Sequence, residues 1–292
     1  MSERSTSMAD YDAMSTRASA RVMETYSTSF SLATRLLDPR TRADIRNLYA
    51  VVRIADEIVD GTAADAGLTG TEIHRELDAF QEEVMRAIDT GFSTNPTVHA
   101  FAGTARRTHI DSEHLTAFFS SMRRDLNRSA VYNEVQRDAY VYGSAEVIGL
   151  MCLTIFVSGR DLPPEQLARC ATGARRLGAA FQNINFLRDL HEDTTELGRR
   201  YLGDGRPLTD DIRDSLIATV RADLAVAEET VHLLPTRVRA GVLAALILYR
   251  ELTERLAVTP ATEVMRRRVS VPTRVKATIP VRALIGATRL RS

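Results

Sequence analysis

The chain has 292 residues, of which 44% are hydrophobic and 26% are charged. These fractions are typical of a globular protein and exclude a disordered, collagen-like or disulfide-stapled chain. Basic and acidic residues are equal in number, so the formal net charge is zero. The longest apolar stretches, 147–157 and 242–249, fall short of the roughly 20 residues of a bilayer span, and no transmembrane helix is expected.

Helix start and stop signals recur along the chain, whereas alternating β-branched runs are nearly absent. A helix is predicted to begin after Asp38 and to end at Gly61. The next helix follows a capping box at 69–72 and ends at Gly91. Further helices are predicted to open at 95–96 and 111–114, and to cover about 133–157, 164–201, 209–234 and 235–257.

A single all-α domain over 1–292, with about ten helices, is the simplest architecture for this pattern. Within it, residues 1–10 are expected to be disordered and 277–292 to form a basic tail. Because no strand is predicted, the chain has no Rossmann sheet, and no nicotinamide cofactor is expected. The N-terminus has no apolar core behind a basic start, so it does not have the pattern of a secretory signal and a cytoplasmic location is predicted.

A first acidic segment lies near the end of the helix predicted after Asp38. Asp56 and Asp60 are four residues apart, and Arg53 lies one turn before Asp56. Residues with this spacing project from nearly the same helical face. Two acidic side chains placed in this way repel each other by a few tenths of a kcal/mol in water, and a bound cation would remove that cost.

A second acidic segment lies about 130 residues further along the chain. Asn185, Asp189 and Asp193 follow one another at intervals of four residues, so their side-chain oxygens share a helical face. Mg²⁺ binds through one or two carboxylates, waters and substrate phosphate oxygens, and two such segments facing each other would hold a diphosphate. For either segment alone, the alternative is a solvated helix face that forms ion pairs with neighbouring arginines.

The segments 56–60 and 185–193 resemble the two aspartate-rich motifs of the squalene and phytoene synthases, the head-to-head prenyl transferases. The resemblance covers most of the chain, roughly 25–276, and within the family it is strongest to bacterial phytoene synthases. Further segments that resemble landmarks of the family are 26–33, 49–53, 140–149, 198–202, 249–252 and 268–271.

The resemblance implies an all-helical isoprenoid-synthase fold around a large central cavity. Tyr140 matches a mechanistic tyrosine of the family and joins the four aspartates in the implied catalytic set. The residues implied to hold Mg²⁺, with Mn²⁺ as a substitute, are Asp56, Asp60, Asn185, Asp189 and Asp193. The residues implied to contact the substrate are Ser27, Ser29, Tyr49, Arg53, Gln182, Arg188, Tyr249 and Arg268.

The chain departs from the family pattern at two places. Tyr26 stands where the family often has histidine. Residues 144–146 read Ser-Ala-Glu where the family often has Val-Ala-Gly. Glu146 is therefore either a partner of the ligand-binding residues or a residue outside the cavity, and the sequence leaves both interpretations open.

The reaction implied by the resemblance is the condensation of two geranylgeranyl diphosphates to phytoene through prephytoene diphosphate. The alternative within the family is a squalene or dehydrosqualene synthase that acts on farnesyl diphosphate. An alternative of another class is a non-catalytic helical scaffold derived from the family, although a scaffold has no need for clustered acidic side chains. No nucleic-acid partner is expected.

The segment 264–292 contains eight basic and no acidic residues. Apolar residues are interspersed with these charges, a pattern that suits peripheral contact with an anionic membrane and not a span. The alternative is that the basic residues cover the rest of the chain, which carries the balancing net charge of −8. On the first interpretation, the cytoplasmic protein meets the inner face of the cell membrane.

Overall fold

The computed structural model of the chain describes residues 2–127, 133–190 and 208–290. Over these residues the chain is helical and contains no strand, which confirms the predicted all-α class. The long helices are α1 (Ser2–Tyr26), α3 (Pro39–Asp60), α5 (Gly70–Thr90), α6 (Pro96–Thr108), α7 (Ser112–Asp125), α10 (Pro164–Arg188), α12 (Asp210–Thr230), α13 (Thr236–Ala257) and α15 (Thr273–Arg289). The shorter helices are α2 (Thr28–Thr34), α4 (Thr62–Asp65), α8 (Glu134–Val141), α9 (Val147–Val157) and α14 (Ala261–Val264).

The capping signals in the sequence bound α3 and α5 as predicted. The side chain of Asp38 accepts a hydrogen bond from the backbone N–H of Thr41 at the start of α3, and Gly61 follows its end with a φ of 134°. Thr69 and Glu72 form a reciprocal capping box ahead of α5. These side chains satisfy backbone groups that have no partner within the helix, so the local sequence determines where α3 and α5 begin. The helix predicted over 164–201 is shorter than expected, since α10 ends at Arg188 and Asp189 is its C-cap residue.

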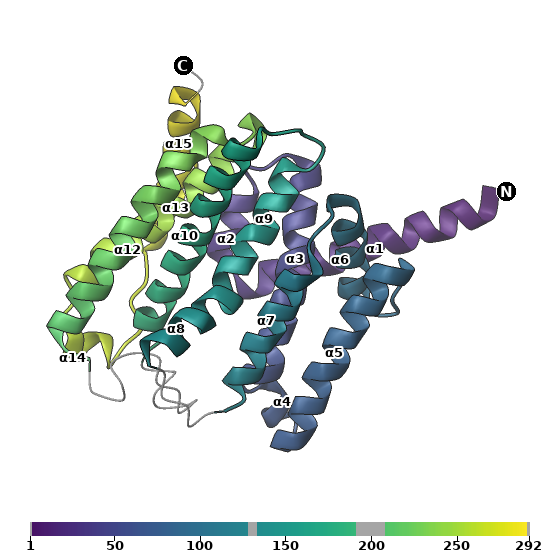
Figure 1. Cartoon of the computed structure of the whole chain (residues 1–292), viewed down its shortest axis with the longest axis horizontal. Helices are drawn as coiled ribbons and strands as arrows, with labels where there is room; N and C mark the ends of the chain where they lie inside the picture. Colours follow the sequence, from purple (N-terminus) through teal and green to yellow (C-terminus); the bar gives the residue numbers. More distant parts are fainter. Residues whose placement is uncertain (1, 128–132, 191–207, 291–292) are drawn as a thin grey trace.

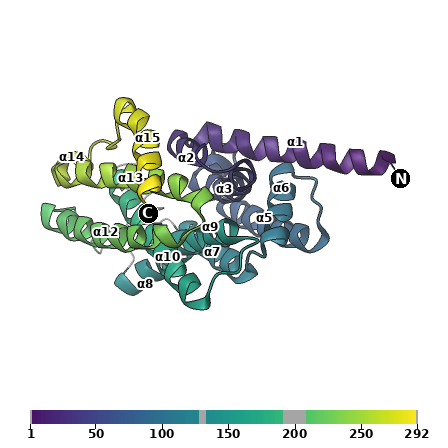
Figure 2. The same ribbon diagram turned by 90° about the horizontal axis from the view of Figure 1, so that it is seen from above.

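Two segments near the ends of the chain differ from the sequence-based expectation. Most of 1–10, expected to be disordered, belongs to α1, whose first half projects from the bundle (Figures 1 and 2). The rest of α1 packs on α3 and α6, and extending an existing helix costs little because its nucleus is already formed. Much of the expected tail, 277–289, belongs to α15, which packs against α13 and buries Ile279, Ala283 and Ala287.

The helix predicted over 133–157 is continuous but contains a π-helical turn, Tyr142–Glu146, between α8 and α9. Gly143 in this turn lies so close to α7 that a Cβ atom there would be 2.6 Å from the carbonyl oxygen of Ala117. Single π-helical turns are rare in proteins, and those that occur are often found at functional sites. The wider turn changes which side chains face inward, an effect that a period of 3.6 residues does not predict.

One described helix, which runs from 135 to 157 through the π-helical turn, is long and apolar enough by length and composition to cross a membrane. Its continuous apolar part, 147–157, is too short for a span, which is why the sequence did not predict one. Half of the apolar window is buried inside the protein, and α9 contacts α3, α6, α7 and α10. This packing is typical of a core helix.

Two hydrophobic clusters form the core, and Figure 1 shows the helices that surround each of them. The first lies among α10, α12, α13 and α15 and includes Ile184 and Val220. The second lies among α3, α5, α6, α7 and α9 and includes Leu77 and Phe118. Helices α9 and α10 contact each other where the two clusters meet, and their packing positions the site described below.

We expect the substitution Gly178→Ala on α10 to destabilise the fold by about 1–3 kcal/mol. A Cβ atom at Gly178 would lie 2.4 Å from the carbonyl oxygen of Ala145, so α10 and the π-helical turn would have to separate. The matched control is Gly103→Ala on α6, where a Cβ atom meets nothing within 4 Å. There, the higher helix propensity of alanine should stabilise the protein by about 0.5–1 kcal/mol. Urea denaturation measures both effects, and a stabilised Gly178→Ala would contradict this description of the packing.

Candidate active site

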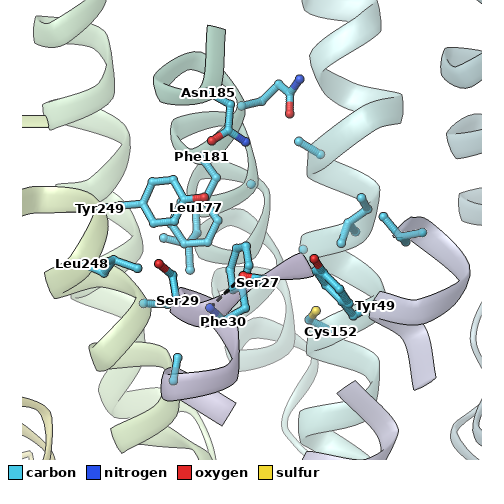
Figure 3. Close-up of a pocket in the computed structure, with 18 of the residues that line it drawn as sticks. Ser27, Ser29, Phe30, Tyr49, Cys152, Leu177, Phe181, Asn185, Leu248 and Tyr249 are labelled. Atoms are coloured by element: carbon cyan, nitrogen blue, oxygen red, sulfur yellow. Dashed lines mark hydrogen bonds between the residues drawn. The ribbon is translucent and has the colours of Figure 1, made fainter. Parts of the chain in front are cut away.

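A cavity of about 780 Å³ lies between the two clusters, with α2, α3, α9, α10 and α13 among its walls (Figure 3). Aromatic side chains form much of its interior. The ring of Phe30 lies 5.9 Å from that of Phe181 and 6.2 Å from that of Tyr249 between centroids, and Phe181 stacks on Tyr249 at 3.6 Å. The volume is within the range of small-molecule sites, and the apolar interior suits a hydrocarbon chain.

The structure brings the sequence-predicted site residues together around this cavity. All of those that the structure describes line it. They are Ser27, Ser29, Tyr49, Arg53, Asp56, Asp60, Tyr140, Gln182, Asn185, Arg188, Asp189, Tyr249 and Arg268. The predicted ligand Asp193 and the segment 198–202 lie outside the described residues.

The first acidic segment is on the last turns of α3, where Arg53 is surrounded by charge and by an aromatic ring. Its guanidinium contacts the carboxylate of Glu57 and lies 4.0 Å from that of Asp56. The same guanidinium lies 4.5 Å from the ring centroid of Tyr26, so the residue that departs from the family pattern forms a cation–π contact here. Burial acts to lower the pKa of Arg53, but the two carboxylates outweigh it, and the raised pKa keeps the guanidinium charged.

The second acidic segment is at the end of α10, on another wall of the cavity. Asp189 accepts a hydrogen bond of 2.9 Å from Nε of Arg188 and lies 2.9 Å from Nε of Arg268, in the segment between α14 and α15. One turn earlier, the Oδ1 atom of Asn185 is buried and has no hydrogen-bond partner. A buried acceptor without a partner is costly, so this oxygen is ready to bind a ligand group.

Hydroxyl groups lie among these charges. Burial raises the pKa of Tyr49 to about 12, and burial also raises the pKa of Tyr249. Both phenols therefore stay protonated at neutral pH and can donate hydrogen bonds. Ser27 caps α2 by accepting a hydrogen bond of 3.1 Å from the backbone N–H of Phe30, and Figure 3 shows the Ser29 side chain directed into the cavity.

Tyr140 has a partner that the sequence analysis missed. Its hydroxyl donates a hydrogen bond of 2.8 Å to Oδ2 of Asp125, and both residues are only 4% exposed. Asp125 is the last residue of α7 and also lines the cavity. No motif or periodicity points to Asp125, because its role depends on how α7 packs against the helix that carries Tyr140.

The π-helical turn resolves the two interpretations of Glu146. The Glu146 carboxylate accepts a hydrogen bond of 2.6 Å from Nε of Arg175, and Glu146 is not among the residues that line the cavity. Ser144 in the same turn does line it, is 8% exposed, and has no hydrogen-bond partner for its hydroxyl. Lys276, the single lysine of the chain, is a further cavity residue that the sequence analysis did not select.

Comparison with known proteins agrees with the resemblance found in the two acidic segments. The sequence model of the squalene/phytoene synthase family matches residues 23–205. "Phytoene synthase 3, chloroplastic" of Zea mays is 30% identical over 256 residues, which are 80% of this chain and 57% of the maize protein. Phytoene synthase of Arthrospira platensis is 27% identical over 275 residues, which are 85% of each chain. The chain thus matches little more than half the length of the maize relative.

Solved structures share the arrangement of helices. A dehydrosqualene synthase superposes with a TM-score of 0.76 at 18% identity, covering 96% of this chain and 99% of that protein. The squalene synthase HpnC from Alicyclobacillus acidocaldarius superposes with a TM-score of 0.66 at 20% identity, covering 86% of this chain and 93% of that protein. At these identities the similarity shows the fold alone, and it confirms the expected isoprenoid-synthase architecture.

We expect Tyr140→Phe and Ser144→Ala to have opposite effects on stability. Tyr140→Phe removes a hydrogen bond from the buried carboxylate of Asp125 and should cost about 1–3 kcal/mol. Ser144→Ala removes a buried hydroxyl that has no partner and should be neutral or stabilising by up to about 1 kcal/mol. Chemical denaturation of the two variants gives the comparison, and a larger loss of stability for Ser144→Ala would contradict the hydrogen bonding described here.

Proposed function

We propose that this chain, which belongs to the squalene/phytoene synthase family, condenses two prenyl diphosphates head to head and releases two diphosphate ions. The family is one of prenyl transferases. The observation that carries the proposal is the convergence of both acidic segments and of three arginines on one cavity with an otherwise largely apolar interior. Charged groups suit the diphosphates, and the apolar wall suits the prenyl chains. We further propose two geranylgeranyl diphosphates as substrates and phytoene as product, because the relatives described above carry that name.

The proposed reaction proceeds in two halves without a reductant. The carbon–oxygen bond of one substrate breaks, the double bond of the other attacks the allylic cation, and loss of a proton closes the cyclopropane of prephytoene diphosphate. The second diphosphate then leaves, the carbon skeleton rearranges, and loss of another proton gives the triene. Because no hydride is consumed, the reaction to phytoene requires no nicotinamide cofactor.

Three arginines are proposed to bind the diphosphate oxygens. Arg188 and Arg268 already contact Asp189, but a guanidinium has several N–H donors and can bind a carboxylate and a phosphate together. The acidic neighbours of Arg53 raise the pKa of its guanidinium, which is therefore charged as well. With the protonated hydroxyls of Tyr49 and Tyr249, these groups stabilise the negative charge that develops on the leaving group.

Tyr140 and the apolar wall are proposed to protect the allylic cation. The hydroxyl of Tyr140 donates a hydrogen bond to the carboxylate of Asp125. This negative neighbour shifts electron density of the phenol toward its ring. An electron-rich ring face attracts a cation. Phe30 and Phe181 exclude water from the same space and thereby prevent capture of the cation as an alcohol.

The oxygen atoms on the cavity wall fit a divalent cation that binds together with a diphosphate. Among the residues that the structure describes, no group of three or more His, Cys, Asp or Glu side chains could hold a metal ion alone. Mg²⁺ needs only one or two protein carboxylates when water and phosphate complete its shell, and the buried Oδ1 of Asn185 lacks any partner. Asp56 and Asp60 on one wall, and Asn185 and Asp189 on the other, would hold Mg²⁺ or Mn²⁺. The bound ion would supply further neutralisation of the leaving diphosphate.

A squalene or dehydrosqualene synthase acting on farnesyl diphosphate is the alternative within the family. The solved structures above carry these names, but their low identity to this chain restricts the comparison to the fold. The maize relative is named as chloroplastic. For this chain we propose a cytoplasmic enzyme that makes peripheral contact with the membrane that receives its lipophilic product.

We expect the protein to convert geranylgeranyl diphosphate to phytoene with Mg²⁺ and without NADPH. An excess of EDTA should abolish the product, because the metal would no longer neutralise the leaving group. Asp56→Asn should lower turnover at least about a hundredfold, because it removes a proposed metal ligand. The helical content should stay unchanged, since asparagine has nearly the volume of aspartate and the 4.0 Å ion pair with Arg53 is weak. Product chromatography and circular dichroism measure the two properties.

The matched control is Asp89→Asn on the exposed face of α5, which should keep full activity. A preference for farnesyl diphosphate of more than about tenfold in kcat/KM would replace the phytoene assignment by the alternative within the family. Full turnover in EDTA would reject the metal sites. Absence of turnover with either substrate would support the non-catalytic scaffold.

A further inference from the structure

Helix α15 has two faces of different character. One face is packed against α13 and buries Ile279, Ala283 and Ala287. Lys276 in its first turns lines the cavity, as do residues 268–271 that precede the helix. Figure 2 shows α15 at the edge of the bundle beside α13, so its other face is directed away from the protein.

The outward face of α15 exposes three large apolar side chains side by side. Val281, Leu284 and Ile285 are 60%, 49% and 48% exposed. Their spacing of three and four residues places them on one face of the helix. The other exposed large apolar side chains that the structure describes are spread over other helices and turns. A contiguous exposed apolar group of this kind marks an interaction surface more often than scattered residues do.

Basic residues flank the apolar group on α15, and acidic residues are absent from it. Arg274, Arg282 and Arg289 are exposed. Arg274 lies seven residues before Val281 and Arg289 four residues after Ile285, spacings that place both near the apolar face, and Arg282 directly follows Val281 at its edge. The sequence from 264 to 292 contains eight basic and no acidic residues. The surface of α15 therefore combines apolar side chains with positive charge.

Several basic residues of this segment form ion pairs within the protein. Arg267 pairs with Glu263, Arg268 with Asp189, and Arg282 with Glu251 at 2.7 Å. These contacts agree with the alternative that the basic segment covers an acidic body. They do not explain why Val281, Leu284 and Ile285 face solvent, because apolar side chains gain nothing from an acidic neighbour.

We propose that the outward face of α15 docks on an anionic lipid bilayer, with Val281, Leu284 and Ile285 in the interfacial region and with Arg274 and Arg289 at the headgroups. A helix that combines an apolar face with basic residues lies in the plane of an anionic membrane surface. A second copy of this chain is a poorer partner, since a symmetric contact through this face brings arginines next to arginines. This surface supplies a site for the peripheral membrane contact of the proposed function, on which the inference rests. Its position places the bilayer beside a helix that also contributes Lys276 to the cavity wall.

Vesicle flotation of the full chain tests this surface. The vesicles contain equal parts of phosphatidylglycerol and phosphatidylcholine, with pure phosphatidylcholine for comparison. The triple variant V281S/L284S/I285S should lower the partition coefficient for anionic vesicles at least about tenfold, because three apolar side chains are removed from the interface. The matched control is V258S/L167S, which changes exposed apolar residues elsewhere and should float as the unchanged protein does.

A charge variant provides a second test that leaves the apolar side chains in place. Arg274→Gln should lower the partition coefficient about fivefold at low salt and much less at high salt. The control Arg86→Gln on the exposed face of α5 should have no effect. The Arg274 variant keeps the proposal testable even if the triple variant does not fold, which circular dichroism establishes.

Three results would overturn the proposal. They are equal flotation of the triple variant and the unchanged protein, equal binding to neutral and anionic vesicles, and a dimer that the triple variant converts to a monomer without any vesicle binding. Flotation requires no substrate, so the test is independent of the proposed chemistry. A protein that floats with vesicles but gives no product would contradict the proposed function and leave this inference standing. An active protein that does not float would contradict this inference alone.

Discussion

The carboxylate of Asp189 lies between the guanidinium groups of Arg188 and Arg268, and this contact joins the end of α10 to the segment before α15 at the cavity. Charged groups beside an apolar interior are costly unless each has a partner. Arg53 meets the same requirement on α3 through Asp56 and Glu57. The charges needed for a diphosphate are therefore already oriented in the protein, which is the condition under which electrostatic stabilisation of a leaving group is most effective.

The apolar part of the cavity depends on close helix packing. Gly178 brings α10 against the π-helical turn, and Gly143 in that turn approaches α7. This arrangement places Tyr140 within reach of Asp125 and leaves the Ser144 hydroxyl without a partner in the cavity wall. Stability and site geometry are thus connected, because the contacts that hold α7, α9 and α10 together also determine which side chains face the substrate space.

Local properties of the sequence, such as caps and four-residue spacing, predict several features of the structure. These features are the α class, the boundaries of α3 and α5, and the pairs Asp56–Asp60 and Asn185–Asp189. Contacts between helices were not predictable in this way. The pairing of Tyr140 with Asp125, the position of Tyr26 over Arg53 and the placement of Glu146 outside the cavity depend on tertiary packing. The helical state of most of 1–10 was also missed, since it follows from attachment to a packed helix and not from its own composition. Asp193 stays a prediction.

The central claim is that both acidic segments bind metal and diphosphate across one cavity. A crystal structure of the full chain with Mn²⁺ and a thiodiphosphate analogue of geranylgeranyl diphosphate, measured with anomalous scattering, tests it most directly. The account predicts anomalous peaks beside Asp56 and Asp60 and beside Asn185 and Asp189, with the diphosphate groups between them and the prenyl chains among Phe30 and Phe181. Mn²⁺ bound only elsewhere, or prenyl chains outside the cavity, would contradict it.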